Sequence, residues 1–302
     1  MLYDIIIIGA GPAGLTAAVY ARRANKTVLI LDKGAFGGQI AFSPKVENYP
    51  AFESITGAEL ADKMVEQALS QGADVEVENV IDVKVDGNIK TVITEDGNEF
   101  SAKSLIIAGG AKHRHLNVPN EEKFLGEGIS FCAVCDGAFY KDKTVALIGG
   151  GNSALQEAIL LSETSKKVII VQNLDFLTGE KKLQEIIEKR DNIEVILGAT
   201  VDSVIDSREF SGIVINKNGE KQELNVEGMF VAIGLEPDNG PFSKLVDLDQ
   251  WGYVDADETC RTKTEGVFVA GDCRKKTLRQ ITTATADGAM AAVSACRYID
   301  SL

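Results

Sequence analysis

Residues 3–32 read YDIIIIGAGPAGLTAAVYARRANKTVLILD, and this stretch decides the fold. Its apolar run over 3–8 ends abruptly at a glycine, as a buried parallel strand does. The alanine-rich segment 15–24 predicts a helix, and the β-branched segment 27–31 predicts a second strand that ends at Asp32. Together these elements form a βαβ unit of about 30 residues, the length of a dinucleotide-binding fingerprint.

The turn between the first strand and the helix carries a G-x-G-x-x-G pattern. Gly9 allows the turn, Gly11 lets the backbone approach a pyrophosphate, and Gly14 lets helix and strand pack closely. The helix N-terminus then faces the phosphate charge, and Asp32 can accept hydrogen bonds from a ribose hydroxyl. A glycine-rich turn without a ligand is the alternative, but strand, helix, strand and terminal acid are all in place. We therefore predict a dinucleotide site that includes Gly9, Gly11, Pro12, Ala13, Gly14 and Asp32.

A second unit of the same kind begins further along the chain. An apolar strand over 144–148 precedes the turn at 149–154, which reads GGGNSA and matches G-x-G-x-x-A. A helix over 155–161 and a strand over 167–171 are predicted to follow. The architecture therefore repeats within one chain.

The end of that second strand lacks the residues that usually read a pyridine nucleotide. NADPH needs cations there for its 2′-phosphate, but 172–178 reads QNLDFLT, without Arg or Lys. NADH would prefer an acid at the strand end, where Gln172 stands, and Asp175 comes three residues late. One interpretation is that this unit serves only as a scaffold.

A C-x-x-C pair precedes the second unit. Cys132 and Cys135 are spaced for a disulfide, which near βαβ units favours redox chemistry, and Asp136 can shuttle the proton that a thiol–disulfide cycle requires. Zinc bound by this pair with His113 and His115 is the alternative, although the spacing is not that of a usual zinc module. The remaining cysteines, Cys260, Cys273 and Cys296, are isolated and expected in small apolar sites.

Length and composition limit the classes of protein. The chain has 302 residues, which suggests two domains, and its 45% hydrophobic residues exclude a mostly disordered chain. A net charge of −14 argues against general nucleic-acid binding, because the phosphate backbone would be repelled. The longest uncharged stretch, 5–21, contains three glycines and a proline and follows Asp4 rather than basic residues. We expect a cytoplasmic protein without a membrane segment.

The chain resembles the low-molecular-weight thioredoxin reductases along essentially its whole length. Segments 118–124 and 131–139, which contain the cysteine pair, are similar to that family's redox segment. Segments 37–39 (GGQ) and 47–50 (ENYP) resemble its flavin-contacting segments. Gly271-Asp272, Arg279-Gln280 and 281–292 resemble its second flavin motif.

This resemblance implies an α/β fold of two Rossmann-like, three-layer ββα nucleotide-binding domains, the second inserted in the first. Residues 1–113 and 241–302 would bind FAD, and 114–240 would form the inserted redox domain, rotating on hinges near 112–114 and 238–241. It also implies a homodimer, with thioredoxin attacked by Cys132 while Cys135 faces the flavin. Beyond the first turn, the implied FAD-binding residues are Lys33, Gly38, Gln39, Asn48, Gly271, Asp272, Arg279, Gln280 and Ile281.

The chain departs from the family pattern at the pyridine-nucleotide end. Relatives that use NADPH carry His-Arg-Arg in place of Gln172-Asn173-Leu174 and a further Arg in place of Thr178; they also tend to carry Asp for Asn152 and Glu for Gln156. This combination resembles the ferredoxin-dependent flavin thioredoxin reductases, which lack a working NADPH site, and it implies reduced ferredoxin as the donor.

Two other functions stay open. One is an NADPH or NADH enzyme with unusual ribose contacts, and the other is an FAD-binding redox sensor without turnover. Asp136 beside the cysteines argues against a sensor, which needs no matched proton donor. Because ferredoxins are generally acidic, the ferredoxin hypothesis needs a local basic patch. The candidates are Arg274-Lys275-Lys276, preferred because it adjoins the flavin motif, Lys166-Lys167 and Lys181-Lys182.

Overall fold

The computed structural model describes residues 1–34, 36–43, 46 and 48–302, apart from the side chains of Phe42 and Cys135. The chain forms two compact units. Unit 1 consists of Met1–Lys112 and Glu236–Leu302, and unit 2 of His113–Leu235. The chain thus returns from unit 2 to unit 1 after Leu235, five residues before the expected boundary at 240/241. Asp238 belongs to unit 1, where it pairs with Lys33 and Lys112.

Unit 1 is built on a mixed sheet whose described strands follow the order β3-β2-β1-β6-β5-β4, with β17 also paired to β6. Strands β1, β2, β3, β6 and β17 pair in parallel, whereas β4, β5 and β6 form an antiparallel meander. The bounds are β1 Leu2–Ile8, β2 Val28–Asp32, β3 Asp74–Val77, β4 Val80–Asp86, β5 Ile89–Thr94, β6 Glu99–Ile107 and β17 Val267–Val269.

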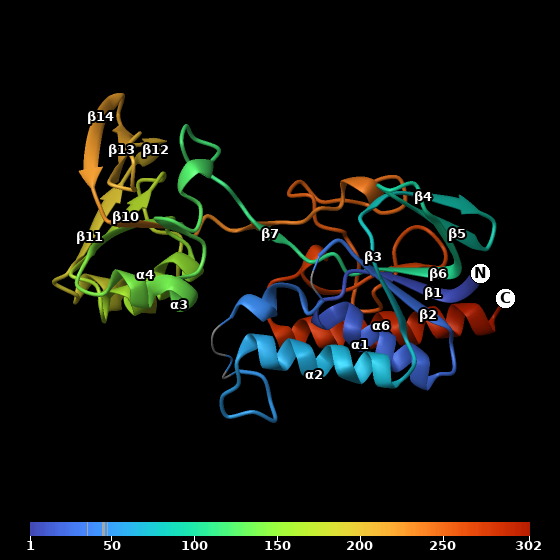
Figure 1. The fold of residues 1–302 in the computed structure, drawn as a ribbon. Helices are drawn as coiled ribbons and strands as arrows, with labels where there is room; N and C mark the ends of the chain where they lie inside the picture. Colours follow the sequence, from blue (N-terminus) through green and yellow to red (C-terminus); the bar gives the residue numbers. More distant parts are fainter. Residues whose placement is uncertain (35, 44–45, 47) are drawn as a thin grey trace. The chain divides into compact units, whose positions relative to one another are not determined.

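Helices α1 (Pro12–Arg23), α2 (Gly57–Ser70) and α6 (Ile281–Asp300) lie on one side of this sheet (Figure 1). Strand β1 is buried on both faces. Ile5 and Ile7 pack in the cluster that contains the helix alanines, and Ile6 and Ile8 pack in the cluster on the opposite face. A near-continuous isoleucine run is therefore what a strand covered on both sides requires.

Unit 2 repeats the plan with a parallel sheet in the order β11-β10-β9-β15-β8. Its helices pack on one face, and an antiparallel sheet in the order β12-β13-β14 packs on the other. The strands are β8 Ile129–Ser130, β9 Thr144–Ile148, β10 Lys167–Gln172, β11 Ile193–Leu197, β12 Ala199–Val204, β13 Gly212–Lys217, β14 Glu220–Asn225 and β15 Gly228–Val231. The helices are α3 Ala133–Asp136, α4 Asn152–Ser162 and α5 Lys181–Glu188, and β7 (Lys112–His113) pairs with β16 (Leu235–Glu236) where the chain crosses between units.

The α/β class with two Rossmann-like nucleotide-binding folds is confirmed. Element bounds differ by a few residues from the sequence prediction. Helix α1 begins at Pro12 rather than 15, because proline suits the first helical position. Helix α6 begins at Ile281, since the side chain of Gln280 forms a capping box with Thr283. No helix in the described part of the chain is long and apolar enough to cross a membrane.

Candidate active site

A cavity of about 690 Å³ opens in unit 1 where the strands end. Residues from the first glycine turn, the end of β2, the 38–48 segment and the 271–281 segment line it together. The expected cofactor residues on its wall are Gly9, Gly11, Pro12, Ala13, Asp32, Lys33, Gly38, Gln39, Asn48, Gly271, Asp272, Arg279, Gln280 and Ile281. Gly14 does not line it, and a β-carbon there would lie 1.8 Å from the carbonyl oxygen of Gly9, so Gly14 serves the packing of the turn.

The glycines make the cavity floor a bare backbone surface. Gly9 has φ +110°, and a β-carbon on it would lie 2.2 Å from the carbonyl oxygen of Ala108. Gly38 has φ +63°, and a β-carbon on it would lie 2.9 Å from the α-carbon of Gly11. Gly11 is the N-cap of α1, and within the described residues no side chain accepts a hydrogen bond from the first N–H groups of this helix at the cap. The first-turn amides thus suit an anion such as a pyrophosphate.

Asp32 holds the glycine turn in place. Its Oδ2 accepts from the backbone N–H of Ala10 at 2.6 Å, and its Oδ1 accepts from the N–H of Gly34 at 2.9 Å. A carboxylate has further lone pairs, and Asp32 also lines the cavity. The contact with a ribose hydroxyl therefore stays a prediction beside this structural role.

Asp272 offers an acceptor without a partner. Its Oδ1 is buried and accepts no hydrogen bond from the described residues, although the side chain lines the cavity. Burial raises the pKa of Asp272, and Lys276 and Arg279 partly oppose this effect. A buried polar atom normally finds a partner, so an acceptor at this wall fits a ligand that brings a hydroxyl or N–H. The unpartnered Asp272 oxygen and the exposed backbone of the glycine turn together fit FAD.

Other wall residues are held by one another. Asn48 donates to Gln280 Oε1 at 2.8 Å, and Arg279 donates to the carbonyl of Asp272 at 3.2 Å while lying 3.9 Å over the Tyr253 ring. Gln39 donates to the carbonyl of Ala111. Position 47 of the ENYP segment, whose flavin contact stays a prediction, lies outside the described residues.

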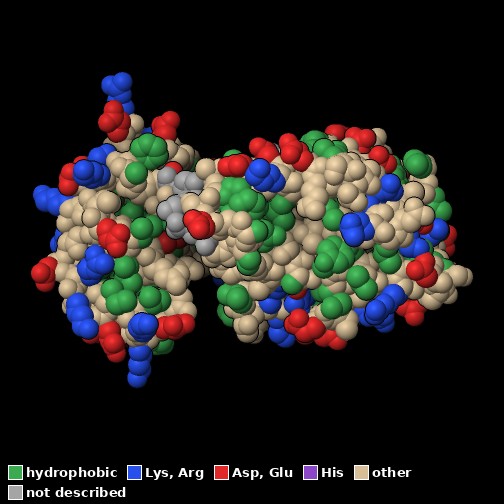
Figure 2. All heavy atoms as spheres, turned by 90° about the horizontal axis from the view of Figure 1, so that it is seen from below, with side chains coloured by type: hydrophobic (Ala, Val, Ile, Leu, Met, Phe, Trp, Pro, Cys, Tyr) green, Lys and Arg blue, Asp and Glu red, His purple; other side chains and the backbone are tan. Residues whose placement is uncertain are grey.

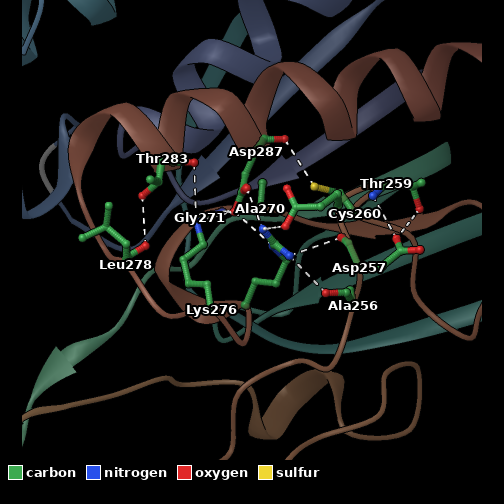
Figure 3. Close-up of polar contacts among 12 residues, drawn as sticks. Ala256, Asp257, Thr259, Cys260, Ala270, Gly271, Lys276, Leu278, Thr283 and Asp287 are labelled. Atoms are coloured by element: carbon green, nitrogen blue, oxygen red, sulfur yellow. Dashed lines mark hydrogen bonds and ion pairs between the residues drawn. The ribbon is translucent and has the colours of Figure 1, made fainter.

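Sequence reasoning missed Asp287, which anchors the turn at Gly271 (Figure 3). Asp287 lies on α6, and its carboxylate accepts from the Gly271 N–H at 3.0 Å, from Arg274 at 2.9 and 3.1 Å and from Lys276 at 2.6 Å. Burial alone would raise its pKa, but these hydrogen bonds lower it on balance. The available signal was an acid within the alanine-rich stretch of a helix that follows a cluster of cations.

The same contacts correct the expected ferredoxin patch at Arg274-Lys275-Lys276. Arg274 is 4% exposed and the Lys276 side chain 7%, and both bind Asp287. Lys275 is exposed but pairs with Asp255 at 3.3 Å. Two of the three cations therefore stabilise the cavity wall, and the segment exposes one paired lysine rather than a basic patch. On the face drawn in Figure 2, basic and acidic side chains are interspersed over the described residues.

The redox segment lies in unit 2, where β8 leads into the short helix α3. Cys132 is disulfide-bonded. Ser130 Oγ donates to Asp136 Oδ2 at 2.6 Å and accepts from the Cys132 N–H at 3.0 Å, so the serine links the acid to the backbone of the cysteine. Asp136 also lines a smaller cavity of about 290 Å³ with Ser130, Phe139 and Tyr140. The side chain of Cys135 lies outside the described part, so its pairing and orientation stay predictions.

The histidines of the zinc alternative have other contacts. The rings of His113 and His115 lie 5.5 and 4.9 Å from the Phe131 ring, measured between centroids. A disulfide-bonded Cys132 offers no thiolate to a metal. The described residues contain no cluster of three or more metal-ligating side chains. The three isolated cysteines are free and buried.

The second glycine turn, at 149–154, is contacted by residues of the segment that follows β10. Gln172, at the end of β10, is 5% exposed, and a β-carbon on Gly150 would lie 2.6 Å from its Cδ. The N–H groups of Thr178 and Gly179 donate to the carbonyl of Gly150 at 2.8 and 2.9 Å. The strand end thus presents a neutral amide, in a segment without cations from 168 to 180.

Comparisons with known proteins agree with this architecture. The pyridine nucleotide-disulphide oxidoreductase family matches residues 3–288. The thioredoxin reductase of Bacillus subtilis is 41% identical over 304 residues, and the match covers 100% of this chain and 96% of that protein. A 34.2 kDa protein in the rubredoxin operon of Clostridium pasteurianum is 43% identical over 299 residues, and the match covers 98% of this chain and 97% of that protein. The crystal structure of Lactococcus lactis thioredoxin reductase is 39% identical with a TM-score of 0.87, covering 99% of this chain and 100% of that one.

A second solved structure, the thioredoxin reductase of T. acidophilum, is 37% identical with a TM-score of 0.83 and covers 99% of both chains. The matches span nearly the whole of each chain, so they include both units and the cysteine segment. Proteins of this family are flavoproteins, and FAD is the cofactor that the cavity of unit 1 accommodates. The chain belongs to the pyridine nucleotide-disulphide oxidoreductase family and, within it, to the low-molecular-weight thioredoxin reductases.

Proposed function

We propose that this protein reduces the disulfide of a thioredoxin through FAD and a Cys132–Cys135 disulfide. The observation that carries the proposal is a disulfide-bonded Cys132 whose backbone is linked through Ser130 to the carboxylate of Asp136. Relatives named thioredoxin reductase, in Bacillus subtilis and Listeria monocytogenes, are 41% identical over 304 residues and support it.

Each part of the chain has a separate task. The glycine turn, the α1 N-terminus and Asp272 would hold FAD, which supplies the electron pair that opens the disulfide. The Cys132 thiolate then attacks a thioredoxin disulfide, forming a mixed disulfide and releasing the second thioredoxin sulfur as a thiolate. Cys135 attacks the Cys132 sulfur, which restores the protein disulfide and releases the remaining thioredoxin sulfur. Asp136 holds the proton that the leaving thiolate takes.

We further propose that a low-potential carrier, reduced ferredoxin, is the electron donor. A 2′-phosphate is recognised best by bidentate arginine contacts, and the segment after β10 has none to offer. Losing two or three charged hydrogen bonds, at about 1.5–3 kcal/mol each, weakens binding by several decades. Because the dithiol must meet both the flavin and a protein partner, the inserted unit would rotate on the two chain crossings. We also propose a cytoplasmic homodimer, as the resemblance implies.

Anaerobic reduction of the bound flavin, followed by its absorbance, tests the donor. Reduced ferredoxin should bleach the flavin within the turnover time, and micromolar NADPH or NADH should leave it oxidised for much longer. Fast bleaching by NADPH would instead establish a pyridine-nucleotide enzyme with atypical contacts. Thioredoxin then tests the acceptor, because a non-turnover sensor would be reduced once and would not release reduced thioredoxin catalytically.

A further inference from the structure

A second buried carboxyl lies against the redox segment, and the proposed cycle does not use it. Glu157 on α4 accepts the backbone N–H of Ala133, which is the first residue of α3 and directly follows Cys132. The other oxygen of this carboxyl, Oε2, is buried and has no hydrogen-bond partner among the described residues. Burial raises the pKa of Glu157 to about 7, against the lowering effect of the Ala133 bond. Near neutral pH both protonation states are therefore populated.

The charged groups on neighbouring elements are engaged elsewhere or exposed. Asp136 of α3 is bonded to Ser130, and Lys167 of β10 pairs with Glu194 at 2.6 Å. Tyr140 follows α3, and burial followed by the charge of Asp136 raises its pKa. The ionisable residues of α5, the other helix that packs on α4, are all exposed: Lys181, Lys182, Glu185 and Glu188.

We propose that Glu157 is a positioning residue of the redox site: its carboxyl holds the Ala133 amide beside Cys132, and its protonation is coupled to the thiol–thiolate equilibrium of Cys132. This inference rests on the proposed role of the dithiol. While ionised, Glu157 engages an amide N–H that a Cys132 thiolate could use, and its charge opposes that thiolate. Once protonated, it carries no charge and the thiolate forms more readily.

The coupling also bears on the proton balance of the cycle. Reducing a disulfide to two thiols consumes two electrons and two protons. The reduced flavin of the proposed cycle supplies the electrons, and Asp136 serves one sulfur. Glu157, on the helix that packs against α3, holds a second exchangeable proton at the amide of Ala133, the residue that follows Cys132.

Alkylation of Cys132 measures the coupling directly. The full-length, FAD-loaded Cys135→Ser variant is reduced with dithiothreitol, freed of it, and treated with iodoacetamide from about pH 5 to about pH 10. Burial raises the pKa of Cys260 to about 12 and of Cys273 to about 11, and Cys296 is also buried, so Cys132 dominates the signal. We expect two inflections, one from Glu157 and one from the thiol. Adding Glu157→Gln should leave one inflection and accelerate alkylation at neutral pH by about tenfold, the effect of about one pKa unit.

Two further variants make the result decisive. Glu163→Gln removes the same charge from the far end of α4, where the side chain is 56% exposed and lies 3.7 Å from Arg190, and it should leave the profile unchanged. Glu157→Asp keeps a carboxyl and should keep two inflections, so it carries the test if Glu157→Gln fails to fold. Superimposable profiles for Glu157→Gln and its parent, or an equal shift in Glu163→Gln, would overturn the proposal. The measurement needs no thioredoxin turnover, so it fails or succeeds separately from the proposed function.

Discussion

Gln172 turns its side chain over the α-carbon of Gly150, so that a β-carbon on this glycine would lie 2.6 Å from Gln172 Cδ. The carboxamide also donates to the carbonyl of Phe176 at 3.3 Å. Gln172 ends β10, the second strand of the βαβ unit, and this is where a dinucleotide-binding fold contacts the ribose of its ligand. A neutral amide that is already hydrogen-bonded within the chain binds a 2′-phosphate weakly, because it has no charge and one of its N–H donors is occupied.

Placing cations at this strand end should therefore allow NADPH to reduce the flavin. Asn173, Leu174 and Thr178 are exposed, so arginine can replace all three without disturbing the core. Each charged hydrogen bond contributes about 1.5–3 kcal/mol, and the triple variant should bind NADPH at least about tenfold more tightly than the parent. Anaerobic stopped-flow measurement of flavin reduction gives the dissociation constant. NADH, which lacks the 2′-phosphate, is the matched control, and an equal gain with NADH would contradict the argument.

Removal of either cysteine should separate the two half-reactions. In Cys132→Ser and in Cys135→Ser, flavin reduction by the donor should persist, while catalytic reduction of thioredoxin is lost, because one disulfide cycle needs both thiols. Flavin absorbance follows the first step and insulin precipitation by reduced thioredoxin follows the second. Turnover near that of the parent in either variant would show that electrons leave by another route.

Asp136 and Ser130 should contribute unequally. Asp136→Asn removes the proton carrier and should slow thioredoxin reduction by about 10²-fold or more, the usual scale for a proton-transfer group. Ser130→Ala removes only the hydroxyl that donates to Asp136 at 2.6 Å, and we expect a smaller loss. Steady-state rates with saturating thioredoxin compare the two. A larger loss in the serine variant would mean that the hydroxyl, rather than the carboxylate, handles the proton.

Asp287→Asn should weaken FAD binding although Asp287 does not line the cavity. Without this carboxylate, Arg274 and Lys276 lose their buried counter-charge, because Glu258, 3.6 Å from Arg274, is 95% exposed, and the Gly271 turn loses its anchor. We expect the dissociation constant for FAD, measured by quenching of flavin fluorescence, to rise by about tenfold or more. Lys275→Gln changes an exposed neighbour in the same segment and should leave FAD affinity as it is. Unchanged affinity in Asp287→Asn would restrict this network to folding.

Glu157 should also make unit 2 less stable as the pH rises. Its pKa in the folded chain is about 7, against an ordinary value of 4.5, so folding favours the protonated form. The stabilising contribution is complete below the unfolded pKa and is lost as the pH rises through the folded one. Relative to Glu157→Gln, the parent should lose up to about 3 kcal/mol of unfolding free energy between pH 4.5 and pH 8. Urea unfolding at several pH values measures this, and parallel pH dependences would contradict it.

Local sequence was sufficient for the two βαβ units and their order. The run over 3–8 is apolar at every position but one, and the glycine pattern follows it at once, so strand, turn and helix could be read without long-range information. The repeat of this pattern at 144–154 indicated a second Rossmann-like fold in the same way. The redox motif of Cys132, Cys135 and Asp136 could also be predicted from the sequence, because the two cysteines of such a motif lie close together in the chain.

Three-dimensional packing was needed to assign the cations and buried acids. Arg274-Lys275-Lys276 reads as a basic surface along the chain, yet two of these residues turn inward to Asp287, which is more than ten positions away on α6. In the sequence, Glu157 is one of several polar residues of a predicted helix. Only the packing of α4 against α3 brings its carboxyl to the Ala133 amide. A charge in a sequence carries no sign of its burial or its partner. Both depend on which elements meet when the hydrophobic faces close, because burial changes the free energy of a charge and a specific partner compensates for it.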